Sequence, residues 1–380
     1  MNVAIWGTKK EAIYLAEQIK SNSKGNVICF VDNDERKWKS QIDEWPIYSI
    51  HTLEKIYQRQ VDTVLIAIRN GYSIACILKQ LKQINIKNIG LLKPSTYDFN
   101  EEITLSRNSK QIMWLDMLSK QLFPYFQIIL NQTCNLNCKG CTHFANLYNK
   151  DHEEGFYNLD SLEKDIELIA KNTEIFRLRI LGGEPLLYPH IKEALHISRK
   201  YFPNSDIRLV TNGLLLTKVS KDLLKCIYDN SIGVDISLYK PIVKIKNRIC
   251  SLLQEYNINF NFEGIEGEYI KTFEKNINIS GQSNPEKAMI ACHSKQCLTL
   301  LHGKIYKCPF EALSQKFFEY FSFENECNTG YDIKNISNWH RTWDKLYMYP
   351  IDSCKYCSEK VETFDWCNTT TPEYSDWMVI

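Results

Sequence analysis

Residues 126–141, Phe-Gln-Ile-Ile-Leu-Asn-Gln-Thr-Cys-Asn-Leu-Asn-Cys-Lys-Gly-Cys, place three cysteines directly after an apolar strand. The strand is expected to run from Phe126 to Asn131, so Cys134, Cys138 and Cys141 lie on the loop at its carboxyl end, where parallel α/β proteins place their active sites. Thiolates at such spacings hold zinc or an iron–sulfur cluster. Three ligands with no fourth nearby leave one coordination position open, as catalysis requires. The spacing therefore favours a catalytic cluster over structural zinc.

The sequence after this loop alternates between helix and strand patterns. Helices are expected near 160–171, 189–201, 220–229 and 242–256, and strands at 176–181, 206–210, 232–238 and 258–263. Repeated β–α units of this length favour an open parallel barrel or a doubly wound sheet, with the chemistry at the carboxyl ends of the strands. Residues 108–125 are expected to form a helical linker ahead of this domain.

Residues 1–107 predict a second, smaller α/β unit. Apolar strands at 3–6, 27–31, 63–68 and 88–92 are separated by helical segments, which is typical of a parallel sheet covered on both faces. The first turn contains one glycine, Gly7, where a dinucleotide fingerprint has three. Asp32, after the second strand, occupies the place of a ribose-binding acid. A nucleotide-sugar site or a purely structural role is therefore favoured over NAD binding.

Composition excludes several classes of protein. The 380 residues carry 46 Lys and Arg against 45 Asp and Glu, a formal charge of +1, so no global field favours nucleic acid or an anionic membrane. The longest apolar runs, such as residues 63–68, are far below the roughly 18 residues that span a bilayer. The N-terminus does not resemble a signal peptide. These features predict a soluble, cytoplasmic protein.

The fourteen cysteines indicate a second metal site, because a reduced cytosolic chain has no use for a disulfide scaffold. Residues 297–308 predict a hairpin that turns at His302-Gly303, and pairing Leu301 with Lys304 places Cys297 opposite Cys308. Cys354 and Cys357 form another close pair that would complete four ligands. A four-cysteine zinc ribbon is the alternative, since its paired spacing is similar.

The three-cysteine loop resembles the signature Cys-x3-Cys-x2-Cys of the radical S-adenosylmethionine (SAM) superfamily, and residues 181–189, Leu-Gly-Gly-Glu-Pro-Leu-Leu-Tyr-Pro, resemble its second motif. Where many members carry an aromatic residue before the third cysteine, this chain has Gly140. The resemblance implies a partial (β/α)6 barrel at 126–285 and a [4Fe-4S] cluster on Cys134, Cys138 and Cys141. The open iron of that cluster would bind SAM, and one electron would cleave SAM to methionine and a 5′-deoxyadenosyl radical.

The same resemblance implies roles for residues that contact SAM. Gly182, Gly183 and Glu184, with Pro185 completing the motif, would receive the methionyl amine. Thr211, Asn212 and Ser237, at the ends of later strands, would hydrogen-bond its ribose and carboxylate. For these three residues an ordinary turn and a strand serine remain the alternative.

Residues 286–380 resemble the SPASM domain, or its shorter twitch form, which holds auxiliary iron–sulfur clusters. The resemblance implies one further [4Fe-4S] cluster on Cys297, Cys308, Cys354 and Cys357, with Cys292 as a rival to Cys297. Cys327 and Cys367 are left over, either as plain thiols or as hydrogen-atom donors near the substrate.

The N-terminal unit is similar to Rossmann-like domains that precede sugar-modifying enzymes, in which such a domain can bind a nucleotide-linked sugar. The combined resemblance implies an oxidoreductase or epimerase acting on a nucleotide-linked or polymer-linked sugar, with a flavodoxin or ferredoxin as electron donor. A peptide-modifying radical enzyme and a non-catalytic zinc-ribbon regulator are the two alternatives.

Overall fold

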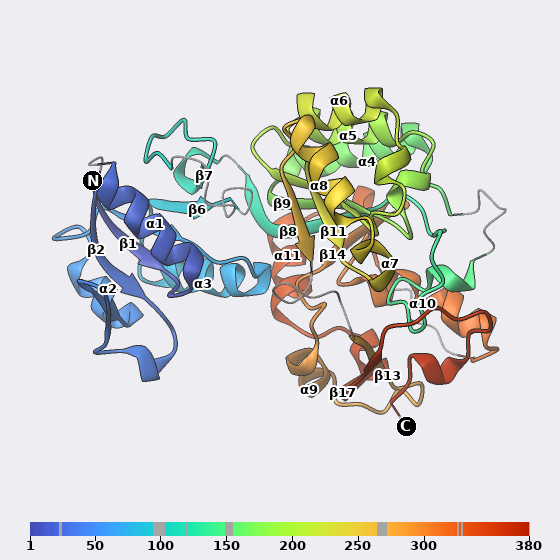
Figure 1. Ribbon diagram of the computed structural model, residues 1–380. Coiled ribbons are helices and arrows are strands. Elements are labelled where there is room, and N and C mark those ends of the chain that lie inside the picture. Colours follow the sequence, from blue (N-terminus) through green and yellow to red (C-terminus); the bar gives the residue numbers. More distant parts are fainter. Residues whose placement is uncertain are drawn as a thin grey trace. The chain divides into compact units, whose positions relative to one another are not determined.

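The computed structural model describes residues 1–22, 25–93, 103–118, 120–148, 155–263, 272–324, 327 and 330–379. The chain divides into two compact units. The first comprises Met1–Pro124 with Glu174–Phe176 and Asn204–Asp206, and the second comprises Tyr125–Thr173, Arg177–Pro203 and Ile207–Ile380 (Figure 1).

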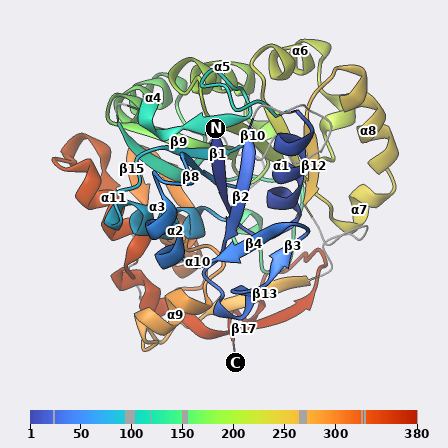
Figure 2. The ribbon, with the colours of Figure 1, turned by 90° about the vertical axis from the view of Figure 1, so that its left-hand side faces the viewer.

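The first unit is a seven-stranded sheet in the order β3-β4-β2-β1-β5-β6-β7. Its strands are β1 (Asn2–Trp6), β2 (Asn26–Val31), β3 (Gln41–Ile42), β4 (Trp45–Tyr48), β5 (Thr63–Ile66), β6 (Ile89–Leu92) and β7 (Ile112–Trp114). The strands β2, β1, β5 and β6 are parallel, as the sequence predicts, and β4, which was not predicted, pairs parallel with β2. Helix α1 (Lys10–Ser21) covers one face, while α2 (Ile50–Ile56) and α3 (Gly71–Gln83) cover the other (Figure 2).

The expected helical linker at 108–125 is wrong. Residues Ile112–Trp114 form β7, which pairs antiparallel with β6, and Gln121 already begins the long strand β8 (Gln121–Ile129). Ile112 and Trp114 enter the apolar core on one face of the sheet, and Met113 enters the core on the other. This period of two is a strand pattern that outweighs helix propensity over so short a segment.

The second unit contains an eight-stranded sheet in the order β12-β11-β10-β9-β8-β14-β15-β16. Its remaining strands are β9 (Thr173–Leu181), β10 (Asp206–Thr211), β11 (Gly233–Ser237), β12 (Phe260–Glu263), β14 (Leu298–Leu301), β15 (Lys304–Tyr306) and β16 (Tyr331–Asp332). The intervening helices are α4 (Leu159–Asn172), α5 (Ile191–Tyr201), α6 (Lys221–Asp229), α7 (Lys240–Val243) and α8 (Lys246–Glu255). Figure 1 shows α4, α5 and α6 together along one side of this sheet. The predicted β–α alternation is confirmed.

The cysteine-rich region continues the barrel sheet. Strand β14 pairs parallel with β8, and the hairpin β14–β15 has the predicted register of Leu301 opposite Lys304. Strand β13 (Thr272–Ile277) instead pairs antiparallel with β17 (Cys357–Asp365). The other helices here are α9 (Pro285–Ala291), α10 (Pro309–Tyr320) and α11 (Trp339–Met348). Among the described residues, β14 therefore adds a parallel strand on the side of β8 away from β12, and the edge strand opposite β12 is β16.

An aromatic core joins α10 to the loop after β8 and to the C-terminal segment. Phe317 is fully buried, with its ring centroid 5.4 Å from that of Phe144 and 5.6 Å from that of Trp377.

None of the helices in the described part of the chain is both long and apolar enough to cross a bilayer.

Replacing Phe317 with alanine removes the centre of this core. We expect the second unit to lose about 3–5 kcal/mol of unfolding free energy, the usual cost of deleting a buried phenylalanine. Urea unfolding followed by near-ultraviolet circular dichroism measures the loss. Tyr320→Ala on the same helix is the control, because that side chain is 50% exposed. Equal unfolding midpoints for the two variants would contradict the assignment of the core.

Candidate active site

The three cysteines lie on the loop that follows β8, as predicted. Cys134 and Cys138 are buried, Cys141 is half-buried, and all three are free thiols. They form an apolar cluster with Leu136 and Ala145, and Leu214, Tyr239, Phe273 and Trp366 pack around it. The Leu136 backbone N–H donates to Cys134 Sγ at 3.4 Å. Burial raises the pKa of Cys134 and Cys138 to about 12, so loading a metal there releases protons.

The loop after β9 is joined to the cysteine loop through two glycines. The Gly183 N–H donates to the Asn131 carbonyl at 2.8 Å, and the Glu184 N–H donates to the Thr133 carbonyl at 2.9 Å. A Cβ atom on Gly182 would lie 2.3 Å from Asn131 Oδ1, and one on Gly183 would lie 2.2 Å from the Thr133 carbonyl oxygen. The glycines therefore allow two loops to approach each other. The N–H groups of Gly183 and Glu184 are thus already used. A methionyl amine donates hydrogen bonds, so it would need carbonyl or carboxylate oxygens of this motif and not these N–H groups.

Glu184 is completely buried, and its carboxylate joins the ends of β9 and β10. It accepts hydrogen bonds from Thr211 Oγ1 at 2.6 Å, the Asn212 N–H at 2.8 Å and the Leu186 N–H at 3.2 Å. Burial raises the pKa of Glu184 to about 7, although these three donors favour the ionised form. Pro185 begins the 3-10 turn Pro185–Leu187 that Glu184 caps.

Asn212 extends this arrangement to the cysteines. Its Nδ2 donates to Asn135 Oδ1 at 2.6 Å and lies 3.6 Å from Cys134 Sγ. The structure thus brings Glu184, Thr211 and Asn212 together beside Cys134. Ser237 lies half-buried at the end of β11, next to Tyr239.

A network of charged side chains on the strands was not predicted. Asp235 of β11 is fully buried and pairs with Arg208 of β10 at 2.6 Å and with Arg177 of β9 at 3.0 Å. Arg179 pairs with Glu263 of β12 and with the Tyr125 hydroxyl, each at 2.7 Å. Burial opposes ionisation of Asp235, but the three arginines outweigh it and hold its pKa below the usual value.

The alternation Arg177-Leu178-Arg179 within an otherwise apolar strand was the sequence signal for this network. The network contains three arginines and two carboxylates, which leaves one excess positive charge.

His143 and Asn146, both on the loop that follows Cys141, carry unpaired polar atoms, and His143 lies near Arg179 of this network. Burial, with the positive charge of Arg179, lowers the pKa of His143 to about 4, so its ring is neutral at neutral pH. His143 Nε2 and both amide atoms of Asn146 are buried without a hydrogen-bond partner in the described structure. Buried polar groups are seldom left unpaired, so these atoms are suited to a bound polar molecule.

The second group of cysteines is assembled differently from the prediction. Strand β14 begins at Leu298 and β15 ends at Tyr306. The last cross-strand pair is Thr299 with Tyr306, so the expected cross-strand pair of Cys297 and Cys308 does not form. Burial has the largest effect on the pKa of Cys357 and raises it. The thiols of Cys308, Cys292 and Cys354, and least that of Cys327, lie close enough to raise it further. Cys292, Cys308, Cys354 and Cys357 are therefore taken as one group, with Cys327 beside it.

Cys297 lies instead beside Arg179 and Tyr125, although it also interacts with Cys292. Burial raises its pKa to about 12. Of the two candidates, Cys292 and not Cys297 therefore belongs to the four-thiol group.

The remaining predicted residues are Cys327, Cys367 and Asp32. Cys327 is buried in the aromatic core under α10, and Cys367 is exposed on the C-terminal segment. Asp32, in the first unit, accepts hydrogen bonds from Thr8 Oγ1 at 2.5 Å and Lys37 Nζ at 2.8 Å. A ribose at Asp32 would have to displace or share these donors.

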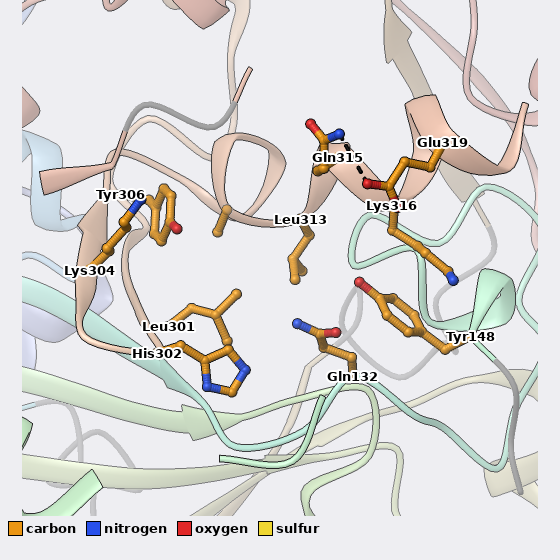
Figure 3. A pocket seen from close by; sticks show the side chains of 11 residues that line it. Gln132, Tyr148, Leu301, His302, Lys304, Tyr306, Leu313, Gln315, Lys316 and Glu319 are labelled. Carbon is orange, nitrogen blue, oxygen red and sulfur yellow. Dashed lines mark hydrogen bonds between the residues drawn. The ribbon is translucent and has the colours of Figure 1, made fainter. Parts of the chain in front are cut away.

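A cavity of about 430 Å³ lies between the β14–β15 hairpin, α10 and the start of the cysteine loop (Figure 3). Its walls carry Gln132, Tyr148, His302, Lys304, Lys316 and Glu319. None of the site residues predicted from the sequence lines it.

Comparison with known proteins identifies the domain that carries the site. Residues 128–249 match the family model of the radical SAM superfamily. The chain contains a radical SAM domain. Residues 1–90 match the family C2185-like, N-terminal.

The curated relatives match mainly through this domain. A GTP 3′,8-cyclase of Helicobacter pylori (strain HPAG1) is 30% identical over 148 residues, 38% of this chain and 43% of the relative. The enzyme of the same name from Aquifex aeolicus (strain VF5) is 32% identical over 111 residues, 29% of this chain and 34% of the relative. The matches thus span less than half of these relatives.

Similar solved structures include two different kinds of protein. The complex of BtrN with AdoMet and 2-DOIA is 17% identical, with a TM-score of 0.39, and the match covers 63% of this chain and 94% of that one. UDP-D-quinovosamine 4-dehydrogenase from Vibrio fischeri is 19% identical, with a TM-score of 0.26, and the match covers 30% of this chain and 93% of that one.

The donor set fits the cofactor of the radical SAM family, a [4Fe-4S] cluster with SAM. Three reduced thiols lie on one loop, and N–H groups of Leu136 and Asn212 approach the sulfur of Cys134. In the described residues no His, Cys, Asp or Glu group is placed to hold a single metal ion. A four-iron cluster is held at its corners, so its ligands stand farther apart than those of one ion.

Replacing Gly183 with alanine should displace the two loops from each other, because the new Cβ would lie 2.2 Å from the Thr133 carbonyl oxygen. We expect loss of iron from the cysteine loop, measured as iron per chain in a Cys354→Ala/Cys357→Ala background. Gly303→Ala is the control for backbone strain without a clash, since Gly303 has a φ of +77° but its Cβ would meet nothing closer than Asp165 Oδ2 at 3.6 Å. Normal iron content in Gly183→Ala would show that the loops do not need this approach.

Replacing Cys292 with alanine should remove the auxiliary cluster, whereas Cys297→Ala should leave it in place, because only Cys292 belongs to the four-thiol group. Iron and acid-labile sulfide of the reconstituted proteins are the measurement, with an expected loss of about four irons in Cys292→Ala alone. The opposite pattern would restore Cys297 as the ligand.

Proposed function

We propose that this radical SAM enzyme acts on a small, hydroxyl-rich anionic substrate, with a nucleotide-linked sugar as the favoured class. When bound, the cluster supplies the electron that cleaves SAM to methionine and a 5′-deoxyadenosyl radical. The observation that carries the substrate class is the charged network with one excess positive charge, together with the buried, unpaired Nε2 of His143, whose ring lies near Arg179.

Each part of the network has a use for such a substrate. Arg179 is a planar donor suited to phosphate oxygens. Glu263, at 35% side-chain exposure the most accessible acid of the network, can accept from sugar hydroxyls. Neutral His143 and the amide of Asn146 can donate and accept without adding charge. The relatives named GTP 3′,8-cyclase make a nucleoside triphosphate the second candidate substrate.

Oxidation is favoured over epimerisation by the positions of the thiols. Epimerisation needs a hydrogen-atom donor at the substrate, but Cys327 lies in the aromatic core and Cys367 is exposed. The group of Cys292, Cys308, Cys354 and Cys357 supports an auxiliary [4Fe-4S] cluster in a SPASM- or twitch-like region, which would accept the second electron of an oxidation. The substrate would then lose a hydrogen atom from carbon and a proton from its hydroxyl, giving a ketone.

We further propose that the enzyme works in the cytoplasm, where reduced thiols are maintained, with a flavodoxin or ferredoxin as electron donor. The first unit would by itself bind a nucleotide-linked sugar at Asp32 or serve as a scaffold. A peptide substrate and a zinc-binding regulator remain the alternatives that the experiment below separates.

The test measures 5′-deoxyadenosine release by the reconstituted enzyme with SAM and dithionite, in the presence of nucleotide sugars, free sugars, GTP or peptides. We expect nucleotide sugars to stimulate release and to yield a product two mass units lighter. A variant with Cys134, Cys138 and Cys141 replaced by alanine should release none. Stimulation by GTP or peptides alone would overturn the proposal that the substrate is a sugar. Zinc without labile sulfide in the protein would overturn the proposal of a radical SAM activity.

Arg179→Gln should raise KM for the charged substrate about tenfold or more, because a hydrogen bond to a charged group contributes roughly 1.5–3 kcal/mol. Arg199→Gln is the matched control, since Arg199 donates to backbone carbonyls at the ends of α5 and α6 instead. An equal KM in both variants would remove Arg179 from the binding site.

A further inference from the structure

The C-terminal segment from Phe364 to Trp377 lies along the cysteine loop. The Lys139 N–H donates to the Cys367 carbonyl at 2.9 Å, and the Thr369 N–H donates to the Asn137 carbonyl at 2.8 Å. Between them, Cys138 and Asn368 form an antiparallel β-bridge. The segment is thus paired by backbone to the loop that carries the cluster ligands.

Side chains strengthen this pairing. Lys139 forms an ion pair with the buried carboxylate of Asp376 at 3.1 Å. The indole N–H of Trp377 donates to the Cys141 carbonyl at 2.8 Å. The segment is therefore held at Lys139 and at Cys141, the two neighbours of Gly140 in the chain.

Gly140 shows how closely the segment approaches. Its φ is +63°, and a Cβ there would lie 2.7 Å from Phe364 Cζ and 2.8 Å from the Asp376 carbonyl oxygen. The absence of an aromatic residue before Cys141 therefore has a physical reason, because the C-terminal segment occupies that space.

Trp366 of this segment contacts the sulfur atom of a predicted cluster ligand. Its indole Nε1 donates to Cys138 Sγ at 3.3 Å. Its ring stacks on Tyr239, with centroids 5.5 Å apart and an interplanar angle of 11°. Tyr239 follows β11, so the indole is held between a barrel strand end and the cysteine loop.

We propose that Trp366 is a positioning residue of the cluster site, which sets the reduction potential of the cluster through its hydrogen bond to Cys138 and shields that sulfur from water. An N–H group that donates to a ligand sulfur stabilises the extra negative charge of the reduced cluster, and hydrogen bonding and solvent exposure both tune such potentials. Cys138 is only 7% exposed, with Trp366 half-buried over it.

This inference rests on the part of the proposed function that places a cluster on the cysteine loop, and it is independent of the substrate. If the wild-type protein carries no cluster signal that depends on Cys134, Cys138 and Cys141, the proposed function fails. If it carries that signal and Trp366 has no effect on it, only this inference fails.

The experiment compares Trp366→Phe with Trp377→Phe. Both changes remove one indole N–H from the same segment, but the N–H of Trp377 donates to a backbone carbonyl and not to sulfur. A redox titration followed by electron paramagnetic resonance measures the midpoint potential of the signal that is lost in the triple-cysteine variant. We expect Trp366→Phe to shift the potential to a more negative value and Trp377→Phe to leave it unchanged.

A second measurement uses the metal-free protein, so it does not depend on cluster loading. In Trp366→Ala, alkylation of Cys138 by iodoacetamide, followed by mass spectrometry, should become several-fold faster, while Cys134 keeps its rate because Asn212 and Leu136 cover it. Loss of the loop cluster in Trp366→Phe but not in Trp377→Phe would also support the proposal. Equal potentials in the two phenylalanine variants, or an unchanged rate at Cys138, would overturn it.

Discussion

The close approach of two loops, at the ends of β8 and β9, is the constraint on which the candidate site depends. Gly182 and Gly183 have no side chain because the backbone of Asn131 and Thr133 passes within about 2.5 Å of where their Cβ atoms would be. The two backbone hydrogen bonds made there fix the start of the cysteine loop. They also turn Glu184 inward, where its carboxylate collects donors from the end of β10. The close approach allowed by the two glycines thus positions residues at the ends of β8, β9 and β10.

Sequence reasoning succeeded where the determinants are local. The strands and helices predicted within residues 126–263 and the turn at His302-Gly303 depend on neighbouring residues, and the structure contains each of them. It failed at 108–125, where three apolar residues decide the structure through burial at a sheet edge. The register of the β14–β15 hairpin was correct, but extending it to Cys297 and Cys308 was not, since periodicity does not show where pairing stops.

The rest of the site could not be predicted because its determinants are far apart in the chain. Trp366 and Cys138 are separated by 228 positions, and nothing near either residue indicates the contact. The charged network has the same character, since Tyr125, Arg179, Asp235 and Glu263 come from four different strands. Only the parallel order of those strands brings them together. The motif resemblance therefore predicts which loop would hold the cofactor, while the residues that shape its surroundings required the fold.

The charged network argues for function more strongly than for stability. Burying an ion pair removes two charges from water, and apolar side chains of similar volume usually stabilise a protein equally well or better. Asp235 has no exposed surface, yet it is ionised because three guanidiniums surround it. An arrangement that served stability alone would balance its charges, whereas this one keeps an arginine in excess and leaves His143 Nε2, near Arg179, without a hydrogen-bond partner. A polar anion would supply the missing charge and the missing hydrogen bonds at once, so a single ligand resolves both features.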